Sequence, residues 1–232
     1  MKISNFLSLV AVCSLFTVAV NAQDTNREKR DLGGNYTRIE ALKGVNVSLH
    51  QCDQDEIEVV TQDCPTSDVD TYIKKGTLFI KMKKVTKGSA VQVFVKFKDV
   101  DEIEVRRGAS VETECLFQHK GKLTLGVAAE SEVEMEIETD EIEVDANSCQ
   151  VVLSGEAKKQ TVTAKGTLKD MKYDALSLKS EDIEIFASEA ECDVQFTNTL
   201  KAECVAGTIT YKGEDSGVVE KIESADGKIQ KL

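Results

Sequence analysis

The chain has 232 residues, of which 41 are acidic and 29 basic, so its formal net charge at pH 7 is −12. This balance excludes nucleic-acid binding as the default role, because such proteins need a concentrated cationic face. Hydrophobic residues make up 41% of the chain, which is enough for a buried core and excludes a disordered acidic chain. One proline and no tryptophan occur, which is unusual beside so much charge.

The N-terminal segment 1–22 has the pattern of a secretory signal peptide. Lys2 provides a cationic start, Phe6–Val20 form an apolar run, and Val20-Asn21-Ala22 offers small residues for cleavage before Gln23. The apolar run is too short for a transmembrane helix, which needs roughly 20 residues. We therefore expect an exported protein without a transmembrane segment, located in the periplasm, on the outer-membrane surface or outside the cell.

Cleavage there removes Lys2 and Cys13, so the mature chain has a net charge of −13 and six cysteines. An even number of cysteines in an exported chain permits disulfides but does not require them, because buried thiols also serve as small hydrophobic residues. Cys52 and Cys64 are the disulfide candidates, on proximity alone. A zinc site is disfavoured because the chain has no CxxC pair and its two histidines, His50 and His119, are far apart.

Residues 23–34, QDTNREKRDLGG, are polar and charged and end in two glycines. This composition predicts a flexible linker between the export signal and a folded domain at 35–232. The dibasic stretch Arg27–Arg30 also resembles a processing site, although a solvated linker is the simpler interpretation.

From Tyr36 onward the hydrophobic pattern has a period of two. Apolar residues alternate with polar ones around residues 45–49, 57–59, 78–82 and 91–97. Such alternation buries one side of each strand. No stretch has the apolar periodicity and caps of a helix, so the sequence predicts an all-β fold.

A short motif recurs along the chain. Asp55-Glu56-Ile57-Glu58-Val59 is repeated at 101–105 and 140–144, and loosely at 181–185. Weaker strands between the later copies halve the spacing to about 20 residues, the size of one solenoid coil. We therefore predict a parallel β-solenoid, in which residues 36–98 could pair antiparallel and cap the first coil. Its continuous ladders explain the scarcity of proline. A β-sandwich is the alternative fold.

Five segments resemble a known family. They are Tyr36–Glu40, Gly44–Val47, Gly108–Val111, Gly207–Gly213 and Gly227–Ile229. Together they are similar to the head GIN domain of putative auto-transporter adhesins, which is frequent in exported proteins of Bacteroidetes-type bacteria. The resemblance covers roughly residues 35–232 and implies an all-β, right-handed parallel β-helix-like solenoid in a cell-envelope setting. It brings no catalytic residues, and no cofactor is expected.

Residues 132–143 are rich in glutamate. Glu132, Glu134, Glu136 and Glu138 alternate with apolar residues, and Glu141 and Glu143 flank Ile142. If carboxylates of neighbouring coils face one another, cations must offset their repulsion. Lysines on adjacent coils are the favoured source, namely Lys122, Lys158, Lys159 and Lys165. The alternative is calcium, with Glu134, Glu136, Glu141 and Glu143 as candidate ligands, but no calcium-binding loop motif is present.

An enzyme is the alternative function, because polysaccharide lyases and glycosidases also use β-helices. The pairs Asp140 with Glu143 and Asp182 with Glu184 could serve as acid and base. Sugar sites usually have aromatic platforms, however, and this chain has four tyrosines and no tryptophan. No nucleophile elbow or phosphate-binding loop occurs, and His119 is expected in a polar turn.

The one cationic cluster comprises Lys74, Lys75, Lys81, Lys83, Lys84 and Lys87. We interpret it as a solvated face or a protected strand edge, with contact to acidic lipopolysaccharide as the alternative. The sequence as a whole predicts an exported, non-enzymatic envelope or surface protein that acts as an adhesin or scaffold. Its partner would be an envelope glycan or a protein, self-association is left open, and no nucleic-acid partner is expected.

Overall fold

The computed structural model describes residues 25–84, 88–167, 170–214 and 216–232. The predicted signal peptide lies outside these residues. The described chain forms fourteen strands and one short 3-10 helix. The first seven strands are β1 (Thr25–Arg30), β2 (Arg38–Leu42), β3 (Asn46–Gln51), β4 (Glu56–Gln62), β5 (Val69–Lys74), β6 (Thr77–Met82) and β7 (Ala90–Phe97), with the helix η1 (Thr66–Asp68) after β4. The others are β8 (Glu102–Arg106), β9 (Ser110–Thr113), β10 (Phe117–Ala128), β11 (Glu132–Asn147), β12 (Gln150–Lys165), β13 (Lys172–Gly213) and β14 (Val218–Lys231).

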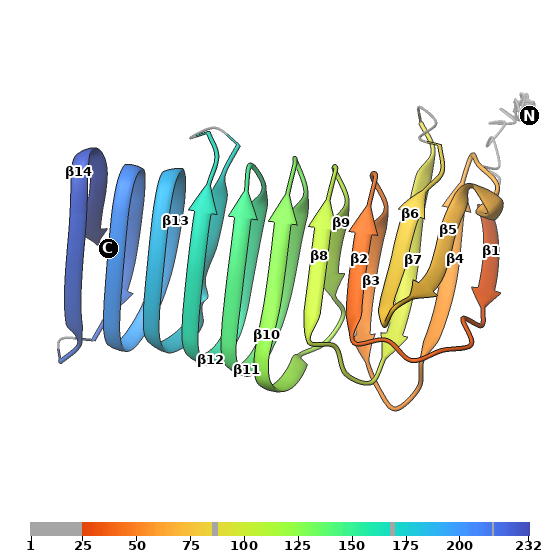
Figure 1. Cartoon of the computed structure of the whole chain (residues 1–232), viewed down its shortest axis with the longest axis horizontal. Helices are drawn as coiled ribbons and strands as arrows, with labels where there is room; N and C mark the ends of the chain where they lie inside the picture. The colour runs from red at the N-terminus through yellow and green to blue at the C-terminus, as the bar shows by residue number, and fades with distance from the viewer. Residues whose placement is uncertain (1–24, 85–87, 168–169, 215) are drawn as a thin grey trace, which may run out of the picture.

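The strands wind into a β-solenoid of about six turns, so the all-β solenoid prediction is confirmed. Each coil has two flat sides, and the long strands β10 to β14 bend from one side to the other without leaving the sheet (Figure 1). On one side Ile103 pairs with Leu125, which pairs with Val144, which pairs with Val162. Each of these partners lies one coil further along the chain. The number of residues between them agrees with the coil length expected from the repeated motif.

The core lies between the two sides. In β11, Val133, Met135 and Ile137 are buried while the intervening glutamates are exposed. Phe97 and Phe117 meet edge to face inside the coils, with ring centroids 5.3 Å apart. Burial of each such side chain stabilises the fold by about 1.5–3 kcal/mol. The alternation seen in the sequence is therefore the alternation between core and solvent.

The coil corners at the upper end in Figure 1 use left-handed backbone conformations. Arg107 and Gly108 have φ of 62° and 70°, and Ala129 and Glu130 have φ of 60° and 59°. The corners stack, because Gly108 N donates to Ala129 O at 2.9 Å and Glu130 N donates to Ser148 O at 2.8 Å. Gly108 suits such a corner because glycine permits a sharp turn.

The N-terminal third does not follow chain order. The coil formed by β6 and β7 pairs in parallel with the coil formed by β2 and β3, on the side opposite β8 and β9. Beyond it, β5 pairs with β6, β4 with β7 and β1 with β4, all antiparallel. The antiparallel pairing predicted within residues 36–98 is therefore confirmed for β4 and β5, while β6 and β7 each pair in parallel on their other side.

The flexible linker predicted for residues 23–34 is wrong for 25–30, which form β1. This strand has no apolar residue, so a hydrophobic pattern could not reveal it. Its ladder with β4 and ion pairs hold it in place, with Arg27 3.2 Å from Glu58 and Lys29 3.0 Å from Glu56. Arg30 also donates to Val69 O at 2.7 Å.

Cys52 and Cys64 are not joined, and all six cysteines of the described residues are free thiols. Cys52 follows β3 at one end of the sheet, and Cys64 follows β4 at the other end. Seven residues of β4 separate the two ends, a span of about 23 Å at 3.3 Å per residue. A disulfide needs Cα atoms within about 7 Å, so proximity in sequence was misleading.

Among the described residues, no helix has the length and apolar character needed to cross a bilayer.

Candidate functional site: a groove along the coil corners

A groove of about 870 Å³ runs across the coil corners at the end opposite the stacked left-handed turns. Successive coils contribute segments 118–120, 138–140, 156–158, 179–181 and 197–198, and Gln51, Lys98 and Asp99 add the wall nearest the N-terminus. The chain bends there at Gly121, which has φ of 113° beside an irregularity in the β10–β11 ladder. Repetition of one corner over several coils therefore creates an elongated site.

Opposite charges alternate along this edge. Lys122, Glu141, Lys159 and Asp182 are consecutive ladder partners on four coils. Lys159 Nζ lies 3.5 Å from Glu141 Oε1, and Lys122 forms an ion pair with Glu143. The predicted offset of glutamates by Lys122 and Lys159 is therefore correct. Such pairs remove the repulsion that stacked carboxylates would cause.

Lys158 and Asp140 form the pair that lies in the groove itself. Lys158 Nζ is 2.5 Å from Asp140 Oδ1, and Gly121 N donates to the other carboxylate oxygen at 3.1 Å. The hydrogen bond from Lys158 is the main cause of the lowered pKa of Asp140, and the same bond raises the pKa of Lys158. Both groups are therefore charged at neutral pH. Lys165, also predicted as a counter-cation, instead lies over the Phe186 ring, 5.6 Å from its centroid.

The four calcium candidates do not form one site. Glu134 and Glu136 belong to the part of β11 that pairs with β9 and β12 on one side of the coil, while Glu141 and Glu143 follow the bend and pair with β10. The expected stacking of carboxylates occurs at few positions. Glu134 lies between Glu112 and Val152, and Glu136 is paired with Ser154.

Beneath the groove a buried polar network holds the bend. Gln160 donates its amide to the Tyr173 hydroxyl and accepts a hydrogen bond from Ser180 at 3.3 Å. All three residues are fully buried. Burial raises the pKa of Tyr173, which therefore stays a neutral hydrogen-bonding group.

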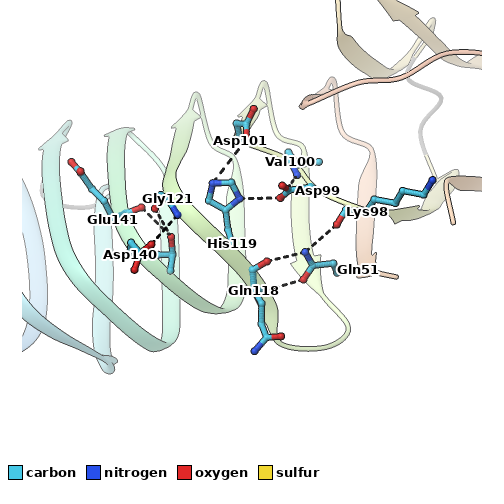
Figure 2. Close-up of polar contacts among 11 residues, drawn as sticks. Gln51, Lys98, Asp99, Val100, Asp101, Gln118, His119, Gly121, Asp140 and Glu141 are labelled. Carbon is cyan, nitrogen blue, oxygen red and sulfur yellow. Dashed lines mark hydrogen bonds and ion pairs between the residues drawn. The ribbon is translucent and has the colours of Figure 1, made fainter. Parts of the chain in front are cut away.

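His119 is the one buried titratable side chain at the groove wall within the described residues, with Asp99 and Asp101 on either side of its ring (Figure 2). Nδ1 lies 3.0 Å from Asp99 Oδ1 and Nε2 lies 4.0 Å from Asp101 Oδ1. The polar turn expected for His119 is wrong, because the ring packs beside Phe117 inside the corner. A signal was present in the sequence, because Asp99-Val100-Asp101 precedes His119 by one coil length.

The same corner is tied to the preceding coils through amide groups. Gln51 Nε2 donates to Lys98 O at 3.1 Å and to Gln118 O at 2.8 Å, and Gln118 N donates to Gln51 Oε1 at 2.9 Å (Figure 2). These bonds fix the backbone around His119. The wall is therefore a preformed surface.

The carboxylates considered for glycoside hydrolysis are ion-paired, hydrogen-bonded or exposed. A general acid needs a raised pKa, but Lys158 keeps Asp140 ionised. Glu143 lies three strand residues further on, a distance of about 10 Å along the strand. In the second pair, Asp182 accepts a hydrogen bond from Asn198 at 2.7 Å and Glu184 is exposed. Neither pair has the buried carboxyl group that this chemistry requires.

The predicted lysine cluster lies on the N-terminal cap, away from the groove. Lys83 Nζ is 3.2 Å from Asp70, and Lys81 lies 4.0 Å from the same carboxylate and over the Tyr72 ring. The cluster is thus partly neutralised. Lys87 lies outside the described residues.

The model of the family described as putative auto-transporter adhesin, head GIN domain, matches residues 35–214. The chain belongs to this family. Solved structures share the fold of this GIN-domain protein, among them the following three. A putative adhesin from Bacteroides fragilis has a TM-score of 0.80 at 16% identity, covering 91% of this chain and 98% of that one.

The second, a putative lipid binding protein from Parabacteroides distasonis, has a TM-score of 0.71 at 19% identity and the same coverages. The third is a putative adhesin from Parabacteroides merdae, with a TM-score of 0.63 at 18% identity, covering 91% of this chain and 97% of that one. No curated protein matches the chain significantly. At these sequence identities, the similarity to the solved structures establishes the fold of this chain and not its function.

Proposed function

We propose that this GIN-domain protein is exported and acts without catalysis at the cell envelope or surface, where its groove binds a polar ligand, an envelope glycan or a protein. Membership of the adhesin family and the signal-peptide pattern of residues 1–22 support export and a surface role. One observation carries the binding role, namely the groove of about 870 Å³ that five successive coil corners line.

The chemistry of the groove suits a ligand with many hydroxyl, amide or charged groups. Its lining contains ammonium groups such as Lys98 and Lys179, carboxylates such as Glu138 and Glu156, and the hydroxyl group of Thr139. Mixed charge favours specificity and recognition of a complementary polar surface. The rigid ladder beneath these side chains avoids the cost of ordering a loop on binding.

Binding can be tested on arrays of envelope polysaccharides and matrix proteins with purified wild-type protein and a charge-reversal variant. Lys179→Glu changes the groove, and Lys74→Glu makes the same change on β5 at the N-terminal cap. We expect retention of one ligand class by the wild type and by Lys74→Glu, with at least ten-fold weaker retention of Lys179→Glu.

Equal retention of both variants would exclude the groove as the binding site. Retention of nothing on either array would favour a spacer role. Release of reducing ends from a polysaccharide would instead support the enzymatic alternative.

A further inference from the structure

Asp99, Asp101 and His119 bring two carboxylates and an imidazole together at the N-terminal wall of the groove. The aspartates flank Val100 between β7 and β8, and His119 comes from β10 in the next coil. One ligand atom from each residue lies within 4.8 Å of the other two, a spacing that no other group of His, Cys, Asp and Glu achieves in the described part of the chain.

The position of the His119 ring is fixed. Its side chain is 5% exposed, and Nδ1 of the ring lies 3.0 Å from Asp99 Oδ1. The same oxygen accepts a hydrogen bond from the Val100 N–H, also at 3.0 Å. A carboxylate can only accept hydrogen bonds, so Nδ1 carries the proton. In the neutral imidazole the lone pair then lies on Nε2.

That lone pair faces a second acceptor. Asp101 Oδ1 is 4.0 Å from Nε2, which exceeds hydrogen-bond distance, and Nε2 has no hydrogen bond to any described residue. Neither aspartate forms an ion pair with a lysine or arginine among the described residues. Nε2 and the Asp101 carboxylate are both electron-pair donors, and a cation placed between them would bind both.

We propose that Nε2 of His119 and the carboxylate of Asp101 bind a divalent transition-metal ion of the Zn²⁺ class, with Asp99 as the carboxylate that orients the ring. One Zn–N bond and one Zn–O bond, each about 2.0–2.2 Å long, together span the distance between Nε2 and Asp101. A tetrahedral angle needs the two ligand atoms about 3.4 Å apart, so Asp101 must approach by about 0.6 Å. Its side chain is 59% exposed and free to do so.

Asp99 has the role that a second carboxylate has beside many metal-binding histidines. A hydrogen bond from the distal ring nitrogen fixes the tautomer and raises the basicity of the ligating nitrogen, and its loss lowers metal affinity about 10–100-fold. The remaining coordination positions are left for water, because His119 and Asp101 supply only two of the four ligands of a tetrahedral ion. Calcium, which prefers six to eight oxygen ligands, fits this nitrogen-containing pair poorly.

The chain contains its own control. It has two histidines, and the other one, His50, also contacts a carboxylate, with Nδ1 3.4 Å from Glu114 Oε2. His50 is 42% exposed and has one carboxylate beside it, so it lacks the orienting residue. His119→Gln and His50→Gln are therefore matched substitutions.

The test is calorimetric titration of Zn²⁺ into protein purified without a histidine tag. We expect one ion per wild-type chain, affinity reduced about ten-fold or more in Asp99→Asn, Asp101→Asn and His119→Gln, and unchanged affinity in His50→Gln. Asp101→Asn changes an exposed side chain, so its unchanged circular dichroism and Tm separate lost binding from lost folding. Nuclear magnetic resonance of the His119 ring should show the zinc-induced shift at Nε2.

Three outcomes would overturn the proposal. They are no binding at millimolar Zn²⁺, equal binding by wild type and Asp101→Asn, and an equal loss in His50→Gln. A zinc-induced shift at Nδ1 would overturn the assignment of the ligating nitrogen. None of these readouts depends on the groove ligand, so this proposal and the proposed function can fail separately.

Discussion

Gly155 packs against the carbonyl group of Ile137 in the neighbouring coil, so closely that a Cβ on Gly155 would lie 2.0 Å from the Ile137 oxygen. Gly155 also has φ of 106°, a conformation that disfavours side chains. Two requirements therefore reserve this position for glycine. The contact shows how tightly consecutive coils stack beside the groove.

Gly155→Ala should destabilise the protein by about 2–4 kcal/mol, because overpacking and left-handed strain add. Urea unfolding followed by circular dichroism measures this change. Gly34→Ala is the matched control, because a Cβ there meets Ile73 at an ordinary 3.5 Å. Equal midpoints for the two variants would contradict this close stacking.

Tyr173→Phe should cost about 1–3 kcal/mol, because it leaves the buried amide of Gln160 without its acceptor. The double variant Tyr173→Phe with Gln160→Met removes both polar groups and should recover part of the loss. The free energies of the single and double variants form a mutant cycle. Additive effects would mean that the two side chains do not interact.

Alkaline pH should destabilise the protein between about pH 9 and 11. Burial raises the pKa of the Cys149 thiol from 9.0 to about 11, so the unfolded chain releases this proton first as the pH rises. Stability from this group is complete below pH 9 and is lost as the pH rises toward 11. Cys149→Ala should flatten the dependence of unfolding free energy on pH, and an unchanged slope would contradict burial of the thiol.

Thiol labelling should find all six cysteines of the mature chain reduced. Cys52 and Cys115 are partly exposed and should react in the folded protein, whereas the buried cysteines should react after unfolding in urea. Mass spectrometry counts the labels. A pair that becomes reactive only after reduction would reveal a disulfide.

The charge ladder predicts a salt-dependent stability. Lys158→Glu would place a third carboxylate near Asp140 and Glu181, so Tm should fall, and by less in 1 M salt, because salt screens repulsion. Lys228→Glu is the control, since its ladder partner Thr208 is uncharged. Millimolar calcium should leave the wild-type Tm unchanged, because lysines already contact Glu141 and Glu143.

The period-two pattern could predict the strands and the coil length, because each coil buries alternate residues against one core. It could not predict which strands pair. Ile57 and Ile103 occupy the same motif, yet Ile57 lies in the antiparallel cap strand β4 and Ile103 in the parallel coil strand β8. Alternation reports which face of a strand is buried and contains no information about the direction or identity of its neighbour.

Local sequence patterns could not predict the groove, because residues from different coils form it. The three residues Asp99, Asp101 and His119 meet because one coil separates them, and their contact requires the register of β8 with β10. Asp140 and Lys158 could be anticipated as counter-charges, since the sequence already required cations beside the glutamates. Recognition of the family came from glycine-centred corners, which mark the fold rather than the site.

Hydrogen–deuterium exchange with the ligand that the arrays identify tests the groove as the binding site most directly, since it locates binding without substitutions. We expect added protection at segments 118–121, 138–140, 156–158 and 179–181, where the coil corners form the groove. No change is expected on β5 at the N-terminal cap. Protection confined to the flat faces of the solenoid or to the cap would show that the ligand binds elsewhere.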